Sequence, residues 1–126
     1  MTLAEGIRSR GFRKWYEREL LIGHSHLALL LFCALGLMMA LEAAFRFRTV
    51  ADQLIDGAAV LACAGAGLWA LRRYLFLLMR AESLAHQADC PGCGAYGRLH
   101  LVDPNAAGDT VAVRCKGCAH EWRIEG

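Results

Sequence analysis

The sequence predicts a membrane protein, in which a two-helix transmembrane hairpin is followed by a small C-terminal β module. Three observations predict this fold class: more than half of the 126 residues are apolar, two long runs contain few charges, and four cysteines form two close pairs near the end of the chain. A soluble chain this short cannot bury so much apolar surface in one core, so lipid is the simpler host. The net charge of +2 does not indicate a nucleic-acid partner, which usually shows as a clustered basic excess.

The first segment, residues 1–19, combines basic and aromatic side chains. Phe12, Trp15 and Tyr16 recur at helical spacing and would form one apolar face flanked by arginines. Such a helix suits the membrane interface, where aromatic rings anchor and basic residues meet anionic lipid. We therefore predict a basic, interfacial amphipathic segment, and a frayed terminus is the alternative.

The first apolar run contains no formal charge over residues 20–41. At about 1.5 Å per residue it crosses the roughly 30 Å hydrocarbon layer, so a first transmembrane helix is expected over residues 20–45. A cleaved signal peptide fits less well, because its apolar region is about 7–15 residues long and ends at a small-x-small site. His24 and His26 point about 200° apart on this helix and cannot jointly bind one metal. Interfacial packing is therefore favoured for them over haem binding.

The second apolar run is followed by Arg72 and Arg73. Each guanidinium would cost about 2.5–3.5 kcal/mol at mid-bilayer, so this transmembrane helix is expected to span residues 50–73 and to leave the membrane there. Its start carries Thr49 three residues before Asp52, a spacing typical of a capping box. A proton or cation shared by Asp52 and Asp56 is the alternative interpretation of these carboxylates.

Orientation follows from the basic residues near the ends of the two runs. The connection, residues 46–49, carries fewer of them than the segments on the other side, so it is expected to face outward. The predicted location is the inner (plasma) membrane, as a multi-pass protein with both termini in the cytoplasm.

The second run is rich in small residues, several of which recur every four positions. Small side chains let helices approach closely in lipid and gain van der Waals contact. The predicted helix-packing residues are Ala58, Ala62, Ala66 and Ala70. Their partner is either the first helix of the same chain or a further subunit, which would be a larger membrane protein or a second copy.

The strongest motif of the chain is a group of four cysteines, which are the candidate metal ligands. They form two Cys-x-x-Cys pairs: Cys90, Cys93, Cys115 and Cys118. Each pair supplies two sulfurs from one tight turn, and four thiolates complete the tetrahedral shell of zinc. Paired spacing of this kind indicates metal in a reducing compartment rather than disulfides. Glycines at positions 92, 94 and 117 are expected to ease left-handed conformations in the turns.

Strands are expected over residues 96–102, 110–114 and 121–124 around these pairs. The pattern Cys-Pro-x-Cys-Gly, a strand pair, Cys-x-x-Cys and then Trp122 resembles the zinc-ribbon family over residues 88–125. The resemblance implies a β zinc ribbon with zinc as cofactor, whose metal supplies much of the folding free energy of a small module. It leaves the function open, because zinc ribbons serve many kinds of protein.

Two neighbouring families fit less well. The ribbon of transcription elongation factors uses an adjacent acidic pair, where this chain has only Asp103. The first cysteine pair also looks like that of rubredoxins, which hold iron for electron transfer, but the second pair lacks the usual proline and glycine. A rubredoxin-like iron electron carrier therefore remains only as an alternative.

The function expected is that of a non-catalytic accessory or assembly subunit of a larger membrane protein complex. A phosphate-binding loop, a nucleophile elbow and a catalytic triad are all missing from the sequence, so neither enzymatic activity nor a small-molecule substrate is expected. The alternative is a membrane-tethered regulatory or nucleic-acid-binding ribbon. Its basic contacts would be Arg98, Arg114, Lys116 and Arg123.

In chain order, six parts are predicted: the interfacial segment (residues 1–19), transmembrane helix 1 (residues 20–45), an external connection (residues 46–49), transmembrane helix 2 (residues 50–73), a cytoplasmic helical extension (residues 74–88) and the zinc ribbon (residues 89–126).

Overall fold

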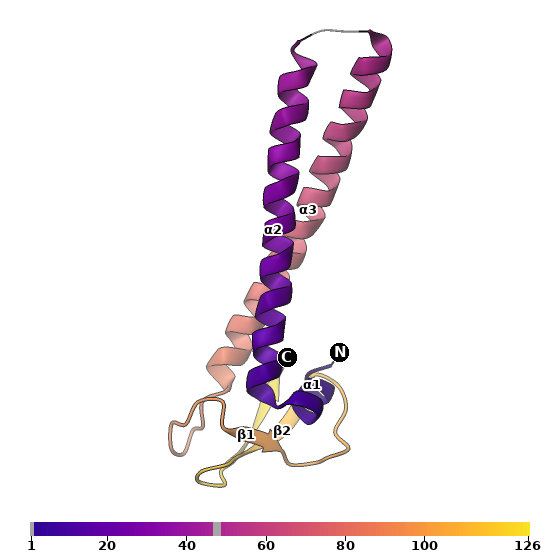
Figure 1. Ribbon diagram of the computed structural model, residues 1–126. Helices are drawn as coiled ribbons and strands as arrows, with labels where there is room; N and C mark the ends of the chain where they lie inside the picture. The colour runs from indigo at the N-terminus through magenta and orange to yellow at the C-terminus, as the bar shows by residue number, and fades with distance from the viewer. Residues whose placement is uncertain (1, 47–48) are drawn as a thin grey trace. The chain divides into compact units, whose positions relative to one another are not determined.

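The structure is a computed structural model that describes residues 2–46 and 49–126 (Figure 1). Within this part of the chain, three helices precede three strands: α1 (Leu3–Arg10), α2 (Phe12–Ala44), α3 (Val50–Gln87), β1 (Leu99–Leu101), β2 (Thr110–Cys115) and β3 (Glu121–Glu125). The predicted connection over residues 46–49 includes Phe47 and Arg48, which lie outside the described residues. The chain divides into two compact units. We name them the hairpin unit, residues 22–76, and the sheet unit, residues 2–21 with 77–126.

The hairpin unit consists of two apolar helical segments that lie side by side, one from α2 and one from α3 (Figure 1). Both parent helices are long and apolar enough to cross a membrane, which agrees with the two long helices predicted from the sequence. Their most apolar windows are only 6% and 11% buried. A core helix of a soluble protein would be mostly buried, so these helices instead present apolar side chains outward.

Close contact within the hairpin unit occurs at glycine and cysteine. A Cβ atom placed on Gly67 would lie 3.3 Å from the Cβ of Cys33, and one placed on Gly36 would lie 3.2 Å from the sulfur of Cys63. Gly67 and Cys63 share one face of α3 with Ala70, which is fully buried, because these positions are four and three residues apart. This face of α3 therefore contacts α2.

The predicted alanine stripe lies largely outside this contacting face. Ala58, Ala62 and Ala66 are exposed, and only Ala70 is buried. Ala62 precedes Cys63 by one position, which is about 100° around a helix, so the stripe drifts off the contacting face.

The sheet unit contains an antiparallel sheet in the order β1-β2-β3, in which Val113 pairs with Leu101 on one side and Trp122 on the other. Side chains of β2 alternate between buried and exposed, as expected for a sheet with one covered face. All three predicted strands are present. The first is shorter than predicted, because Gly97 has a φ of +68° and interrupts the extended backbone before Leu99.

One face of the sheet is covered by α1, the start of α2 and the end of α3. Phe12 and Trp15 are 3% and 1% exposed, and they lie in the same core as the strand side chains. The buried members of this core are Leu3, Ala4, Ile7, Phe12, Trp15, Leu84, Ala88, Leu99, Val111, Val113 and Ile124. The sheet therefore has a larger core than its own strands could supply.

The prediction for residues 1–19 is corrected by the same contacts. The segment is not one helix: Gly11, with a φ of +81°, separates α1 from α2, and its N–H caps α1 by donating to the carbonyl of Ile7. Phe12 and Trp15 pack against the sheet, where protein rather than lipid covers them. The sequence pattern identifies the apolar face of this segment but not the sheet that covers it.

Polar contacts fasten the helices to the sheet. The side chain of Gln87, the last residue of α3, accepts from the N–H of Glu125 at 2.8 Å and donates to its carbonyl at 2.9 Å. The indole of Trp122 donates to the carbonyl of Gln87 at 2.8 Å. Asp109 accepts from the N–H of Leu3 and from Arg80, both at 3.0 Å. These bonds connect α3 to β3, and they connect α1 and α3 to the residue that precedes β2.

Candidate metal centre

The first cysteine turn begins shortly after α3 ends. The N–H of Cys90 donates to the carbonyl of Ala95 at 3.0 Å, and the N–H of Gly94 donates to the carbonyl of Cys90 at 2.9 Å. Gly94 has a φ of +74°, which glycine adopts at little cost. These bonds close the backbone around Cys90 and Cys93 and direct both sulfurs to one side.

The second cysteine turn repeats this pattern at the end of β2. The N–H of Cys115 donates to the carbonyl of His120 at 2.9 Å, and the N–H of Ala119 donates to the carbonyl of Cys115 at 3.2 Å. Ala119 has a φ of +61° and therefore takes the place that Gly94 has in the first turn. The two turns are equivalent, but one uses alanine in a left-handed conformation.

The four sulfurs lie together. The Sγ atoms of Cys90 and Cys118 are 3.4 Å apart, those of Cys93 and Cys115 are 3.6 Å apart, and all four lie within 4.8 Å of one another. Four sulfurs at about 2.3 Å from a tetrahedral zinc would be about 3.8 Å apart, so the group fits one such ion. The predicted metal-binding group of four cysteines in a small β region is confirmed at this level.

Two of the four thiols ionise more readily than an ordinary cysteine. Hydrogen bonds from the N–H groups of Cys118 and Gly117 lower the pKa of Cys115 to about 6. Burial opposes ionisation of Cys90, but the N–H groups of Cys93 and Gly92 and the neighbouring thiols lower its pKa overall. Since only thiolates bind zinc, these backbone donors prepare two ligands.

Cys118 behaves in the opposite way. The N–H of His120 favours its thiolate, but the Cys90 side chain, burial and the other two sulfurs outweigh that bond and raise the pKa of Cys118 to about 12. Four sulfurs this close repel one another once they are negative. A divalent cation at the centre would offset that repulsion. The four sulfurs are therefore suited to bind such a cation.

The glycines of the turns serve different purposes from those predicted. Of positions 92, 94 and 117, only Gly94 is left-handed. A Cβ on Gly92 would lie 3.4 Å from the sulfur of Cys118, so glycine leaves space for the sulfurs there. Gly117 donates its N–H to the sulfur of Cys115 at 3.3 Å. The role of Ala119 was missed, although comparing Cys93-Gly with Cys118-Ala in the sequence would have revealed it.

Replacing Ala119 with glycine is expected to stabilise the metal-loaded protein by about 0.5–1 kcal/mol. The left-handed conformation costs a residue with a Cβ about 1–2 kcal/mol, and glycine removes this cost. The greater conformational entropy of glycine in the unfolded state offsets part of the resulting stabilisation. Denaturant midpoints of the zinc-loaded protein would measure the change. Gly94→Ala is the matched variant and should shift the midpoint the other way; equal midpoints for both variants would contradict the assignment.

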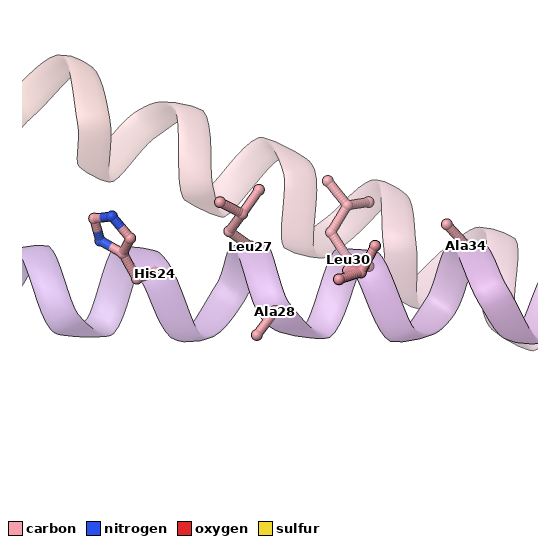
Figure 2. A pocket seen from close by; sticks show the side chains of 6 residues that line it. His24, Leu27, Ala28, Leu30 and Ala34 are labelled. Carbon is pink, nitrogen blue, oxygen red and sulfur yellow. The ribbon is translucent and has the colours of Figure 1, made fainter.

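The two histidines of α2 lie in different surroundings. Figure 2 shows His24 with Leu27 and Leu30 at a surface groove of about 520 Å³, all of whose lining residues come from α2. His26 instead forms a 2.8 Å hydrogen bond between Nδ1 and the carbonyl of Ile22, and its ring lies 5.3 Å from that of Trp69. The contacts of His26 agree with a packing role for its ring.

The carboxylate of Asp52 takes part in a helix cap. Thr49 donates from Oγ1 to Asp52 at 2.7 Å, and the N–H of Asp52 donates back to Thr49 Oγ1 at 3.2 Å. The N–H of Thr49 also donates to this carboxylate at 3.3 Å. This is the capping box that the sequence predicted.

Comparison of the chain with models of protein families, with curated proteins and with solved structures finds no match. The fold and the site themselves define the class of protein. It combines a small antiparallel sheet that carries a four-cysteine group able to hold a metal ion with two helices that are long and apolar enough to span a membrane.

Proposed function

We propose that this chain is a membrane-anchored zinc-ribbon protein that acts, without catalysing a reaction, as an accessory or assembly subunit of a larger membrane protein complex. The observation that carries the proposal is the combination of an apolar hairpin whose most apolar windows are 6% and 11% buried with four sulfurs suited to one tetrahedral ion. Zinc is redox-inert, and four thiolates leave it no open position for a substrate.

Membrane anchoring is supported by the length and the exposure of the helices. The 33 residues of α2 extend for about 50 Å, which exceeds the roughly 30 Å hydrocarbon layer. Large apolar side chains such as Leu31 and Phe32 are 60% and 70% exposed on it. Lipid would cover them. The distribution of basic residues favours cytoplasmic termini, and the reducing cytoplasm suits four thiolates.

A partner helix is supported by the face of α3 that does not contact α2. Ala58, Ala62 and Ala66 are exposed on this face at four-residue spacing. In lipid, helices gain contact energy where small side chains allow the backbones to approach. A helix of another membrane protein would fit this alanine face. The nucleic-acid alternative receives less support, because Arg114 is paired with Glu121.

Purification from a mild detergent tests the proposal. The expected result is co-elution of a second membrane protein, which Ala62→Phe should reduce about tenfold because the larger side chain separates the helices. Leu61→Phe is the matched control, because Leu61 is 75% exposed and lies one position away on α3. A lone monomer at every protein concentration would contradict the accessory role.

A further inference from the structure

A second site in the sheet unit is a cavity of about 310 Å³ between the start of α2 and the segment that leads into β1. Residues of α2 form one wall and residues 96–98 form the other. The lining residues are Phe12, Arg13, Tyr16, Tyr96, Gly97 and Arg98. This volume falls within the range of small-molecule sites, and the cavity is separate from the four cysteines that line the metal centre.

The chemistry of this cavity is suited to an anion. Its lining residues, all within the described part of the chain, include two arginines and two tyrosines and no acidic residue. Glu17 lies outside the lining and pairs with Arg13 at 3.3 Å, at the exposed surface, so Arg98 is the stronger candidate for binding an anion. Guanidinium groups match the oxygens of phosphate through paired hydrogen bonds.

Aromatic contacts hold the α2 wall in place. The rings of Phe12 and Tyr16 stack with centroids 5.9 Å apart and an interplanar angle of 16°, and Phe12 is 3% exposed in the core. Burial, together with the charges of Tyr16 and Asp89, raises the pKa of Tyr96. The Tyr96 phenol therefore keeps its proton at neutral pH and can donate a hydrogen bond to an anion.

The position of the cavity along α2 indicates where such an anion would come from. Tyr16 precedes the uncharged run that begins at residue 20 by one helical turn, or about 6 Å. If that run lies in the hydrocarbon layer, the α2 residues that line the cavity lie at the level of the lipid head groups. We propose that the cavity binds a phosphate group, supplied by the head group of an anionic phospholipid. This inference rests on the proposed membrane anchoring; a soluble phosphate shares the same chemistry.

Native mass spectrometry of the full chain in detergent tests the site. Phosphatidylglycerol is compared with diacylglycerol of the same acyl chains, which lacks the phosphate. Phosphatidylglycerol should be retained preferentially, and Arg98→Gln should reduce this retention about tenfold, because one charge-assisted pair of hydrogen bonds is lost. Arg123→Gln is the matched control, since Arg123 is also an exposed arginine of the sheet unit but lies outside the cavity.

Titration with inorganic phosphate separates the two sources. Arg98-dependent binding of inorganic phosphate without a preference for phosphatidylglycerol supports the site and assigns it to a soluble phosphate. The proposal is overturned if both lipids are retained equally and inorganic phosphate shows no Arg98-dependent binding. It is also overturned if Arg98→Gln and Arg123→Gln reduce the retention of phosphatidylglycerol equally. Zinc content and membrane sedimentation are measured on the same samples. A zinc-free or soluble chain that still binds phosphate through Arg98 would refute the proposed function and leave the site intact.

Discussion

Replacing Cys115 with serine is expected to abolish metal binding and to unfold the sheet of the sheet unit. Cys115 is 2% exposed, ends β2 and provides one of the four sulfurs, so its loss removes a ligand from the centre of the fold. Structural zinc contributes about 10–16 kcal/mol of apparent binding free energy in zinc-finger peptides, more than a small domain has in total stability. Elemental analysis would report the metal, and hydrogen exchange at Val111 and Val113 would report the sheet.

The matched controls are Cys33→Ser and Cys63→Ser. They make the same chemical change in the hairpin unit, away from the four clustered sulfurs, and should leave metal content and exchange protection unchanged. If Cys115→Ser kept both its metal and its protected sheet, the four cysteines would not form the structural centre described above.

Replacing Trp15 with alanine is expected to lower the free energy of unfolding of the sheet unit by about 3–5 kcal/mol. The Trp15 side chain is 1% exposed in the core that joins the helices to the sheet, and Arg80 lies over its ring at 5.8 Å. The loss combines apolar burial with a cavity that the surrounding side chains cannot fill. Hydrogen exchange of the β2 amides in the zinc-loaded protein measures the effect. Exchange unchanged from the parent protein would mean that Trp15 faces lipid instead.

Gly6→Ala tests the same contact from the opposite wall. A Cβ on Gly6 would clash with Cδ1 of Trp15, and the buried ring has no room to move away. Helix propensity alone predicts that alanine stabilises α1 by about 1 kcal/mol, whereas overpacking costs about 1–3 kcal/mol or more. We expect the cost of overpacking to exceed the gain in helix propensity, so that Gly6→Ala destabilises the sheet unit. Gly57→Ala is the matched control: among the described residues, nothing beyond its own helical turn lies within 4 Å of the added Cβ, so no loss should appear.

Sequence reasoning was most successful where structure is local. The cysteine turns were predictable because each is set by four neighbouring residues, and alternation in β2 follows from one covered face. α3 continues to Gln87, which agrees with a helix predicted to extend past Arg73. The capping box of α1 is also local: Thr2 and Glu5 have the required spacing and form it.

Long-range contacts could not be predicted from the same patterns. Phe12 and Trp15 form an apolar helical face, but periodicity does not reveal whether lipid or a sheet far along the chain covers it. The alanine stripe is a similar case. Four-residue spacing identifies a face of a helix but not its neighbour, and the contacts of α3 with α2 include those of Cys63, Gly67 and Trp69.

The most direct test of the account is the metal content of the intact protein, purified without added metal and examined by elemental analysis and X-ray absorption. The expected result is one zinc per chain, bound by four sulfurs at about 2.3 Å. A protein that contains no bound metal, or whose metal is held by oxygen and nitrogen, would contradict the four-cysteine centre on which the proposed function depends.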